Sequence, residues 1–158
     1  PKLSPEARNL ITIENDEMGH GLDASLELEK HLALVMDIHH HWIRDEEYIG
    51  SNDDRVKRVI DSWRGQRPTM HYSYSRDEHL APAGLGDKTH TEMHDIKMLL
   101  ERGCKKQKLR AHSDLLPNAK VNDWALSFGE HFDIQTEAKG KNIASEQLYR
   151  QAVENSVI

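Results

Sequence analysis

Four short apolar segments alternate with helical patterns along the chain, and this alternation constrains the fold more than any other feature. The strand-like segments are residues 10–14, 32–37, 69–73 and 132–137, which are rich in β-branched and apolar side chains. Strands that alternate with helices form parallel sheets through right-handed crossovers. The sequence therefore predicts an α/β fold built from parallel (β/α) units, in which the first two strands are buried.

The helical patterns lie between and after these strands. Helices are predicted over residues 22–30 and 145–153. A third predicted helix carries an apolar stripe of Val56, Val59, Ile60 and Trp63 and begins at a cap, Asp53 or Asp54. A fourth, short helix begins at Asn122 or Asp123. Residues 76–108 break the rhythm, with turn residues at Pro82, Gly84 and Gly86 and then a helical patch. We interpret residues 76–108 as an insertion after the third strand.

Length and cysteine content limit the class of protein. A chain of 158 residues can bury one core, so we expect a single domain over residues 1–158. The longest apolar run, residues 32–36, is far shorter than the roughly 20 residues that a membrane helix needs. A single cysteine, Cys104, excludes an intrachain disulfide and favours a reducing compartment. We therefore predict no membrane association and a cytoplasmic location.

The charge of the chain gives no sign of a nucleic-acid partner. The formal net charge is −6, from 21 basic against 27 acidic residues, whereas a generic DNA-binding surface is basic. Eleven histidines are the second unusual feature. Histidines are mostly neutral at pH 7 and are then available as metal ligands.

Every predicted strand places a carboxylate or an imidazole at its carboxyl end. These residues are Glu14, Asp37, His71 and Glu137. In parallel α/β folds, chemistry gathers at the carboxyl ends of the strands. Carboxylates crowded at one sheet edge repel one another unless cations lie between them. Together these residues predict a multinuclear site for Mn²⁺ or Zn²⁺, since oxygen and nitrogen ligands are present and thiolates are not.

Two neighbouring segments extend the predicted site. Asp37-x-x-His40 adds an imidazole just beyond the second strand, although spacing alone leaves open which of His39, His40 and His41 faces inward. His112 lies in a loop between the third and fourth strands. The basic residues Lys108 and Arg110 precede His112 and are either a solvated charge run or contacts to phosphate. His90 and His94 could chelate a metal across one helical turn, but we predict a solvated face for them.

At these residues the sequence resembles the UV damage endonuclease family. The motifs that carry the resemblance occur in the family's order and are Ile11-Thr12-Ile13-Glu14-Asn15-Asp16, Val35-Met36-Asp37-Ile38-His39-His40-His41, Arg67-Pro68-Thr69-Met70-His71-Tyr72-Ser73, Arg110-Ala111-His112-Ser113-Asp114 and Thr136-Glu137-Ala138-Lys139. Endonuclease IV is similar in the same places. The Asp-Ile-His-His-His run and the His-Ser-Asp order favour the UV damage branch.

The resemblance implies a fold, an activity and a set of ligands. The family is a TIM barrel that uses divalent metals, typically manganese, to nick DNA on the 5′ side of ultraviolet photoproducts. For this chain the resemblance implies Mn²⁺, with Zn²⁺ or Mg²⁺ as alternatives, and damaged double-stranded DNA as the partner. The implied metal ligands are Glu14, Asp37, His40, His71, His112 and Glu137. Residues expected to support these ligands are Asn15, His39, Asp114 and Lys139. No catalytic residue beyond the metal cluster is predicted.

The sequence departs from the family pattern in two ways. Thr69 stands where the family commonly has a lysine whose modified form can bridge metals. The family barrel has eight strands, so these four (β/α) units correspond to its C-terminal half, and the N-terminal half is absent from this chain. A half-barrel leaves two sheet edges and an apolar interior uncovered, which predicts a homodimer that completes a barrel-like assembly.

Three alternatives remain open at this point. An abasic-site endonuclease would use the same kind of metal cluster. A sugar isomerase would bind a small polyol and would need a lysine beside the carboxylates, and the three-histidine run makes that less attractive. A half-barrel could also be a non-catalytic module that assembles with a partner, as Thr69 and the missing half would allow.

Overall fold

A computed structural model describes residues 3–86 and 91–156. Its centre is a parallel sheet with the strand order β1-β2-β3-β4, so strands that are consecutive in the chain are neighbours in space. The strands are β1 (Thr12–Glu14), β2 (Ala33–Asp37), β3 (Thr69–Tyr72) and β4 (Asp133–Thr136). The predicted α/β fold is therefore confirmed, and the sheet has the strand arrangement of half a TIM barrel.

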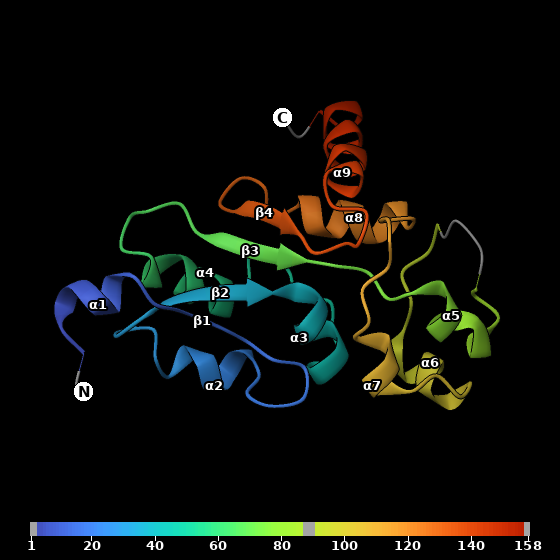
Figure 1. The fold of residues 1–158 in the computed structure, drawn as a ribbon, viewed down its shortest axis with the longest axis horizontal. Helices are drawn as coiled ribbons and strands as arrows, with labels where there is room; N and C mark the ends of the chain where they lie inside the picture. The colour runs from blue at the N-terminus through green and yellow to red at the C-terminus, as the bar shows by residue number, and fades with distance from the viewer. Residues whose placement is uncertain (1–2, 87–90, 157–158) are drawn as a thin grey trace.

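Helices connect the strands (Figure 1). They are α1 (Pro5–Asn9), α2 (Leu22–Leu26), α3 (Ile38–Asp45), α4 (Asp54–Ser62), α5 (Asp77–Leu80), the 3₁₀ helix η1 (Ala81–Ala83), α6 (Ile96–Glu101), α7 (Lys106–Leu109), α8 (Ala119–Leu126) and α9 (Asn142–Glu154). Helices α5, α6 and α7 lie together beyond the carboxyl end of β3 (Figure 1). They fall within or at the edge of residues 76–108, and that this segment is an insertion into a single domain stays a prediction.

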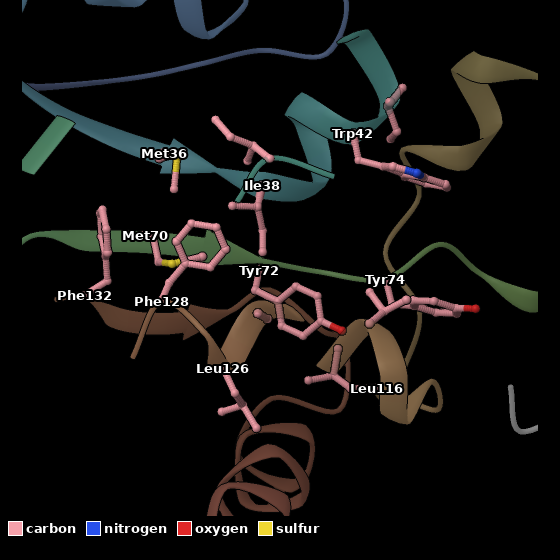
Figure 2. Close-up of a cluster of buried hydrophobic side chains, with 14 of the residues drawn as sticks. Met36, Ile38, Trp42, Met70, Tyr72, Tyr74, Leu116, Leu126, Phe128 and Phe132 are labelled. Carbon is pink, nitrogen blue, oxygen red and sulfur yellow. The ribbon is translucent and has the colours of Figure 1, made fainter. Parts of the chain in front are cut away.

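The register of the sheet separates an apolar face from a polar one. Met36, Met70 and Ile134 are register partners, so their side chains share one face. That face carries the core, where Phe128 and Phe132 pack near Met70 (Figure 2). Asp37, His71 and Gln135 are register partners on the opposite face. The expectation of an apolar interior was therefore wrong at this level of the sheet, where β2, β3 and β4 all carry polar side chains.

The first strand is exposed rather than buried. Thr12 and Glu14 are exposed and Ile13 is half-buried, while Leu34 and Met36 of β2 are fully buried. The reason is position, because β1 has only β2 as a neighbour among the described strands and lies at the sheet edge. The prediction that β2 is buried is confirmed.

Helix α3 was not anticipated, and the start of α8 was misplaced. The structure shows the three histidines within the first turns of α3, where Ile38, Trp42 and Ile43 are buried, instead of in a turn. Helix α8 begins at Ala119 with Asn118 as its cap, so Asn122 and Asp123 lie inside the helix. The Asn122 amide is used elsewhere, since Tyr72 donates to its Oδ1 at 2.6 Å.

The prediction of a solvated face for His90 and His94 is wrong for His94. His94 is buried, and its Nε2 lies 2.8 Å from the Tyr74 hydroxyl. His90 lies outside the described residues. Where the structure describes the chain, no helix is long and apolar enough to cross a membrane. The cytoplasmic location stays a prediction.

Helix α4 offers a test of one cap. Asp53 Oδ1 accepts a hydrogen bond from the Arg55 amide at 2.8 Å, as predicted for this helix start. Both Asp53→Ala and Asp53→Asn remove the ion pair with Arg55. Asp53→Ala is expected to lower the free energy of unfolding by about 1 kcal/mol more than Asp53→Asn, because asparagine caps equally well. The Arg55 side chain lowers the pKa of Asp53 to about 2. The ion-pair part of its contribution is therefore present above the unfolded-state pKa and is lost as the pH falls through 2. Urea denaturation at pH 7 and pH 3 measures both effects, and equal losses for the two variants would contradict the cap.

Candidate metal centre

The four residues at the strand ends converge on one point of the polar face. Glu14, Asp37, His71 and Glu137 each offer one ligand atom, and these atoms lie within 4.8 Å of one another. His71 Nδ1 lies 3.1 Å from Glu14 Oε1 and 3.5 Å from Glu137 Oε1. We call these four residues the strand-end cluster. It brings together side chains that are up to 123 positions apart in the chain, since 137 − 14 = 123.

Asp37 has a separate role for each of its carboxylate oxygens. Oδ1 accepts a hydrogen bond from the His40 amide at 2.8 Å and caps α3. Oδ2 is buried, and none of the described residues gives it a hydrogen bond. Burial raises the pKa of Asp37 to about 7; His40 opposes this shift, whereas the Glu14 and Glu137 carboxylates add to it. A buried carboxylate oxygen without a donor, beside two other carboxylates, fits a cation as its partner.

Asn15 fixes Asp37 from the side of β1. The Asn15 side chain donates to the Asp37 carbonyl at 2.9 Å and accepts from the Asp37 amide at 2.8 Å. This pair of bonds continues the contact between β1 and β2 after their regular pairing ends at Glu14 and Val35. The Asn15 amide thus holds the Asp37 backbone in place, while the predicted role of Asn15 in supporting metal ligands stays a prediction.

His40 lies at the edge of the strand-end cluster. Its Nδ1 is 2.9 Å from the Asn15 carbonyl oxygen, which can only accept, so Nδ1 carries a proton. Its Nε2 lies 3.6 Å from Asp37 Oδ2 and 3.3 Å from Glu17 Oε2. Burial disfavours the charged ring, but Asp37, the Asn15 carbonyl and the two glutamates outweigh burial and raise the pKa of His40. With the proton placed on Nδ1, Nε2 is the atom that can bind a metal.

His112 reaches the site from a loop that lies beside the end of β3. Ser75 and His112 form an isolated antiparallel bridge, and the Ser113 amide donates to the Tyr74 carbonyl at 2.8 Å. The ring Nε2 is 4.0 Å from Glu137 Oε2, so His112 touches the rim of the cluster. Burial lowers the pKa of His112, which favours the neutral ring that a metal requires.

His39 is buried behind the cluster and joins three segments. Its Nδ1 lies 2.8 Å from the Ser73 hydroxyl and its Nε2 3.0 Å from the Ser75 hydroxyl, which in turn donates to the Leu109 carbonyl at 2.7 Å. Because the Ser75 proton goes to Leu109, Ser75 must accept from His39 Nε2–H, and Ser73 must donate to Nδ1. Burial lowers the pKa of His39, in keeping with a neutral ring. Of the histidine run, His40 faces the cluster and His39 is buried against Ser73 and Ser75; the predicted supporting role of His39 stays a prediction.

The other predicted site residues lie further out. Lys108, Asp114 and Lys139 are exposed, and no ion pair joins their side chains to the strand-end cluster within residues 3–86 and 91–156. The Lys139 amide donates to the Ser113 carbonyl at 3.0 Å, which ties the end of β4 to the His112 loop. Thr69 is half-buried on β3, two residues before His71 and on the same face of the sheet.

Two residues at the site were missed by the sequence analysis. Glu17 is 3% exposed and forms ion pairs with Arg110 Nε and His40. Gln135 is the register partner of His71 on β4 and thus shares the polar face. The alternation of β4 could have identified Gln135, since it lies two residues before Glu137. No local signal identifies Glu17, because its burial depends on Arg110, which is 93 positions further along the chain, since 110 − 17 = 93.

The donor set of the site fits hard or borderline divalent metals. Three carboxylates and an imidazole form the strand-end cluster, and two more imidazoles lie at its edge. Oxygen and nitrogen donors of this kind suit manganese, zinc or magnesium. The buried, unpaired Oδ2 of Asp37 is the observation that favours a bound cation over a purely internal ion-pair network. The predicted ligand set itself stays a prediction.

Comparisons with known proteins agree with the geometry. The family model of UV-endonuclease UvdE matches residues 1–157. A protein of Acanthamoeba polyphaga mimivirus described as "Putative UV-damage endonuclease" is 24% identical over 145 residues, which cover 89% of this chain and 42% of that protein. The chain thus spans less than half the length of this curated relative, and no solved structure matches it. Because the family model covers almost the whole chain, the chain belongs to the UV-endonuclease UvdE family.

Proposed function

We propose that this chain supplies the C-terminal half of the barrel, and most of the metal ligands, of a DNA repair endonuclease that nicks DNA on the 5′ side of ultraviolet photoproducts. The observation that carries the proposal is the strand-end cluster, with its buried and unpaired Asp37 oxygen, in a chain that belongs to the UvdE family. The mimivirus relative bears a UV-damage endonuclease description, which points the same way.

The proposed metal ligands are Glu14, Asp37, His71 and Glu137, with His40 and His112 at the edge of the cluster. Divalent ions held there, most simply Mn²⁺, would supply Lewis-acid catalysis for attack of water on the phosphodiester. The protein's own contribution is positioning. Asn15 holds the Asp37 backbone, and the Asn15 carbonyl orients His40. His39 joins α3 to the end of β3 and to α7.

The substrate and the assembly are part of the same proposal. The proposed substrate is damaged double-stranded DNA, and the product ends are a 3′-hydroxyl and a 5′-phosphate. A homodimer that completes a barrel-like assembly stays a prediction. Such a dimer would bring polar sheet faces together, because Asp37, His71 and Gln135 share the uncovered face. Sedimentation as a compact monomer at micromolar concentration would contradict it.

The deciding experiment compares plasmids that differ only in their lesions. The protein is stripped of metal and reloaded with Mn²⁺, Zn²⁺ or Mg²⁺, and then incubated with supercoiled plasmid that is untreated, ultraviolet-irradiated or depurinated. We expect nicking of the irradiated plasmid only, abolished by EDTA and restored by Mn²⁺. End-labelled irradiated duplex then shows whether the cut lies 5′ of the photoproduct.

The controls are two histidine variants. His71→Ala removes a proposed ligand and is expected to abolish nicking, whereas His131→Ala changes an exposed histidine after α8 and should leave nicking unchanged. Preferential cutting of the depurinated plasmid would instead identify an abasic-site endonuclease. Equal cutting of all three plasmids would contradict damage specificity, and the absence of bound metal would contradict the metal centre.

A further inference from the structure

An open groove of about 550 Å³ lies beside the strand-end cluster. Its lining comes from the His112 loop and from the end of β4, and includes Arg110, His112, Gln135, Glu137 and Lys139. Two of these residues, His112 and Glu137, are proposed metal ligands whose facing atoms lie 4.0 Å apart. The groove is therefore continuous with the proposed metal centre, and a molecule bound there would contact both.

The two cations of the groove have free donors. Arg110 is half exposed, and its Nε forms an ion pair with Glu17, but none of the described residues accepts from its two Nη groups. Lys139 is exposed, and its Nζ has no acidic partner within the described ranges. A guanidinium with one edge already fixed can direct its remaining N–H groups at a single acceptor with little loss of entropy. Both groups thus suit an anion that enters from solvent.

Glu17 accounts for the position of Arg110. A carboxylate that is 3% exposed is costly to bury unless a cation neutralises it, and Arg110 and His40 are its partners. Glu17, in the loop after β1, thus holds Arg110, which directly follows α7. Arg110 is thereby fixed at the groove instead of swinging into solvent or onto Glu137.

We propose that the groove is a subsite for a backbone phosphate of DNA next to the scissile one, with Arg110 and Lys139 as phosphate contacts and Glu17 as the positioning residue of Arg110. This inference rests on the proposed function for the identity of the substrate. Phosphate is the expected ligand because guanidinium groups bind its oxygens in a forked geometry. Apart from His112, the lining contains no ring on which a base could stack, so the groove contacts the backbone and carries no sequence information.

The test measures DNA binding in EDTA, so that it does not depend on catalysis. Fluorescence anisotropy follows the binding of a short, undamaged duplex between 50 and 200 mM salt. For each lost phosphate contact, the plot of log K against log salt is expected to become shallower by about 0.9. Arg110→Ala and Lys139→Ala should each show this change. Lys30→Ala, an exposed lysine at the opposite, amino-terminal end of the strands, should not.

The role of Glu17 is tested by a double-mutant cycle. Glu17→Gln is expected to weaken binding through Arg110, so the double variant Glu17→Gln/Arg110→Ala should bind no more weakly than Arg110→Ala alone. Arg110→Lys keeps the charge and should restore most of the salt slope. Unchanged slopes for both Arg110→Ala and Lys139→Ala would overturn the subsite, and additive losses in the double variant would overturn the role of Glu17.

The outcome is separable from that of the plasmid experiment. If irradiated plasmid is not nicked but the slopes change as expected, the groove binds nucleic-acid phosphate and the proposed function is wrong. If nicking occurs and the slopes do not change, the proposed function stands and the subsite is wrong. Circular dichroism of each variant confirms that a loss of binding does not reflect a loss of fold.

Discussion

Replacement of Asp37 with asparagine is expected to lower the affinity for divalent metal by more than about 100-fold. This loss is larger than the one typically caused by substituting a residue that only supports a metal ligand. Oδ2 is the buried, unpaired oxygen of the strand-end cluster, and the substitution removes its charge. Helix α3 is expected to remain, because asparagine caps a helix as well as aspartate does. The measurement is a competition with a chelating dye, together with the gain in unfolding free energy that metal confers. In the wild type that gain is about 2.7 kcal/mol when metal is present at 100 times its dissociation constant.

The matched control is the same substitution at another helix cap. Asp53→Asn changes the cap of α4, which makes no contact with the strand-end cluster among the described residues. It should leave metal affinity unchanged. If both variants lost affinity equally, the effect would come from the caps, and Asp37 would not be a ligand.

In the metal-free protein, the ionised Asp37 carboxylate should destabilise the fold, whereas in the metal-bound protein it contributes to stability by binding the ion. Folding raises the pKa of Asp37 from 3.8 to about 7 through burial, so in this range the folded state binds a proton more tightly than the unfolded chain. The free energy of unfolding should therefore decrease as the pH rises from about 4 to 7. Asp37→Asn removes this dependence and should become more stable than the wild type above pH 7 in EDTA. Urea denaturation at pH 5 and pH 8 measures the difference, and parallel curves for both proteins would contradict it.

The sheet and the strand-end cluster could be predicted because both follow from local pattern and one topological rule. Four apolar segments define the strands, and parallel pairing brings their carboxyl ends to one edge. This rule places Glu14, Asp37, His71 and Glu137 near one another, and the observed register puts them on the same face. The predicted strands differ from the observed ones by one to two residues at their ends.

The elements that were missed depend on contacts between distant segments. Asp37 ends β2 and caps α3 at the same time, so the histidines that follow looked like a turn carrying ligands. Asn122 resembles a cap in sequence, but its amide is engaged by Tyr72, Leu116 and Gln151 inside the fold. Glu17 is buried beside Arg110, a partner that lies far along the chain, after residues 76–108. Such partners are set by tertiary packing, and no local window of sequence contains them.

His39→Leu is expected to reduce metal affinity about 10- to 100-fold, although His39 is not a proposed ligand. His39 links α3, which carries His40, to Ser73 and Ser75 beyond His71, and through Ser75 to Leu109 before His112. Leucine fills much of the space but leaves the Ser73 hydroxyl without its acceptor and Ser75 without its donor. Each buried group left unpaired costs about 1 to 3 kcal/mol of stability. The proposed ligands at His40, His71 and His112 then lose their common support.

A loss of stability alone must be distinguished from a loss of positioning. Leu148→Ala removes a buried side chain from α9, on an element that contributes no residue to the strand-end cluster, and should cost about 2 to 5 kcal/mol. Measured at a temperature where both variants are folded, Leu148→Ala should bind metal like the wild type, whereas His39→Leu should not. His39→Gln, which can still donate to Ser75, should recover part of the affinity. If His39→Leu and Leu148→Ala had equal metal affinity, His39 would only fill space. A role in positioning requires the hydrogen bonds of the His39 ring to Ser73 and Ser75, which leucine cannot form.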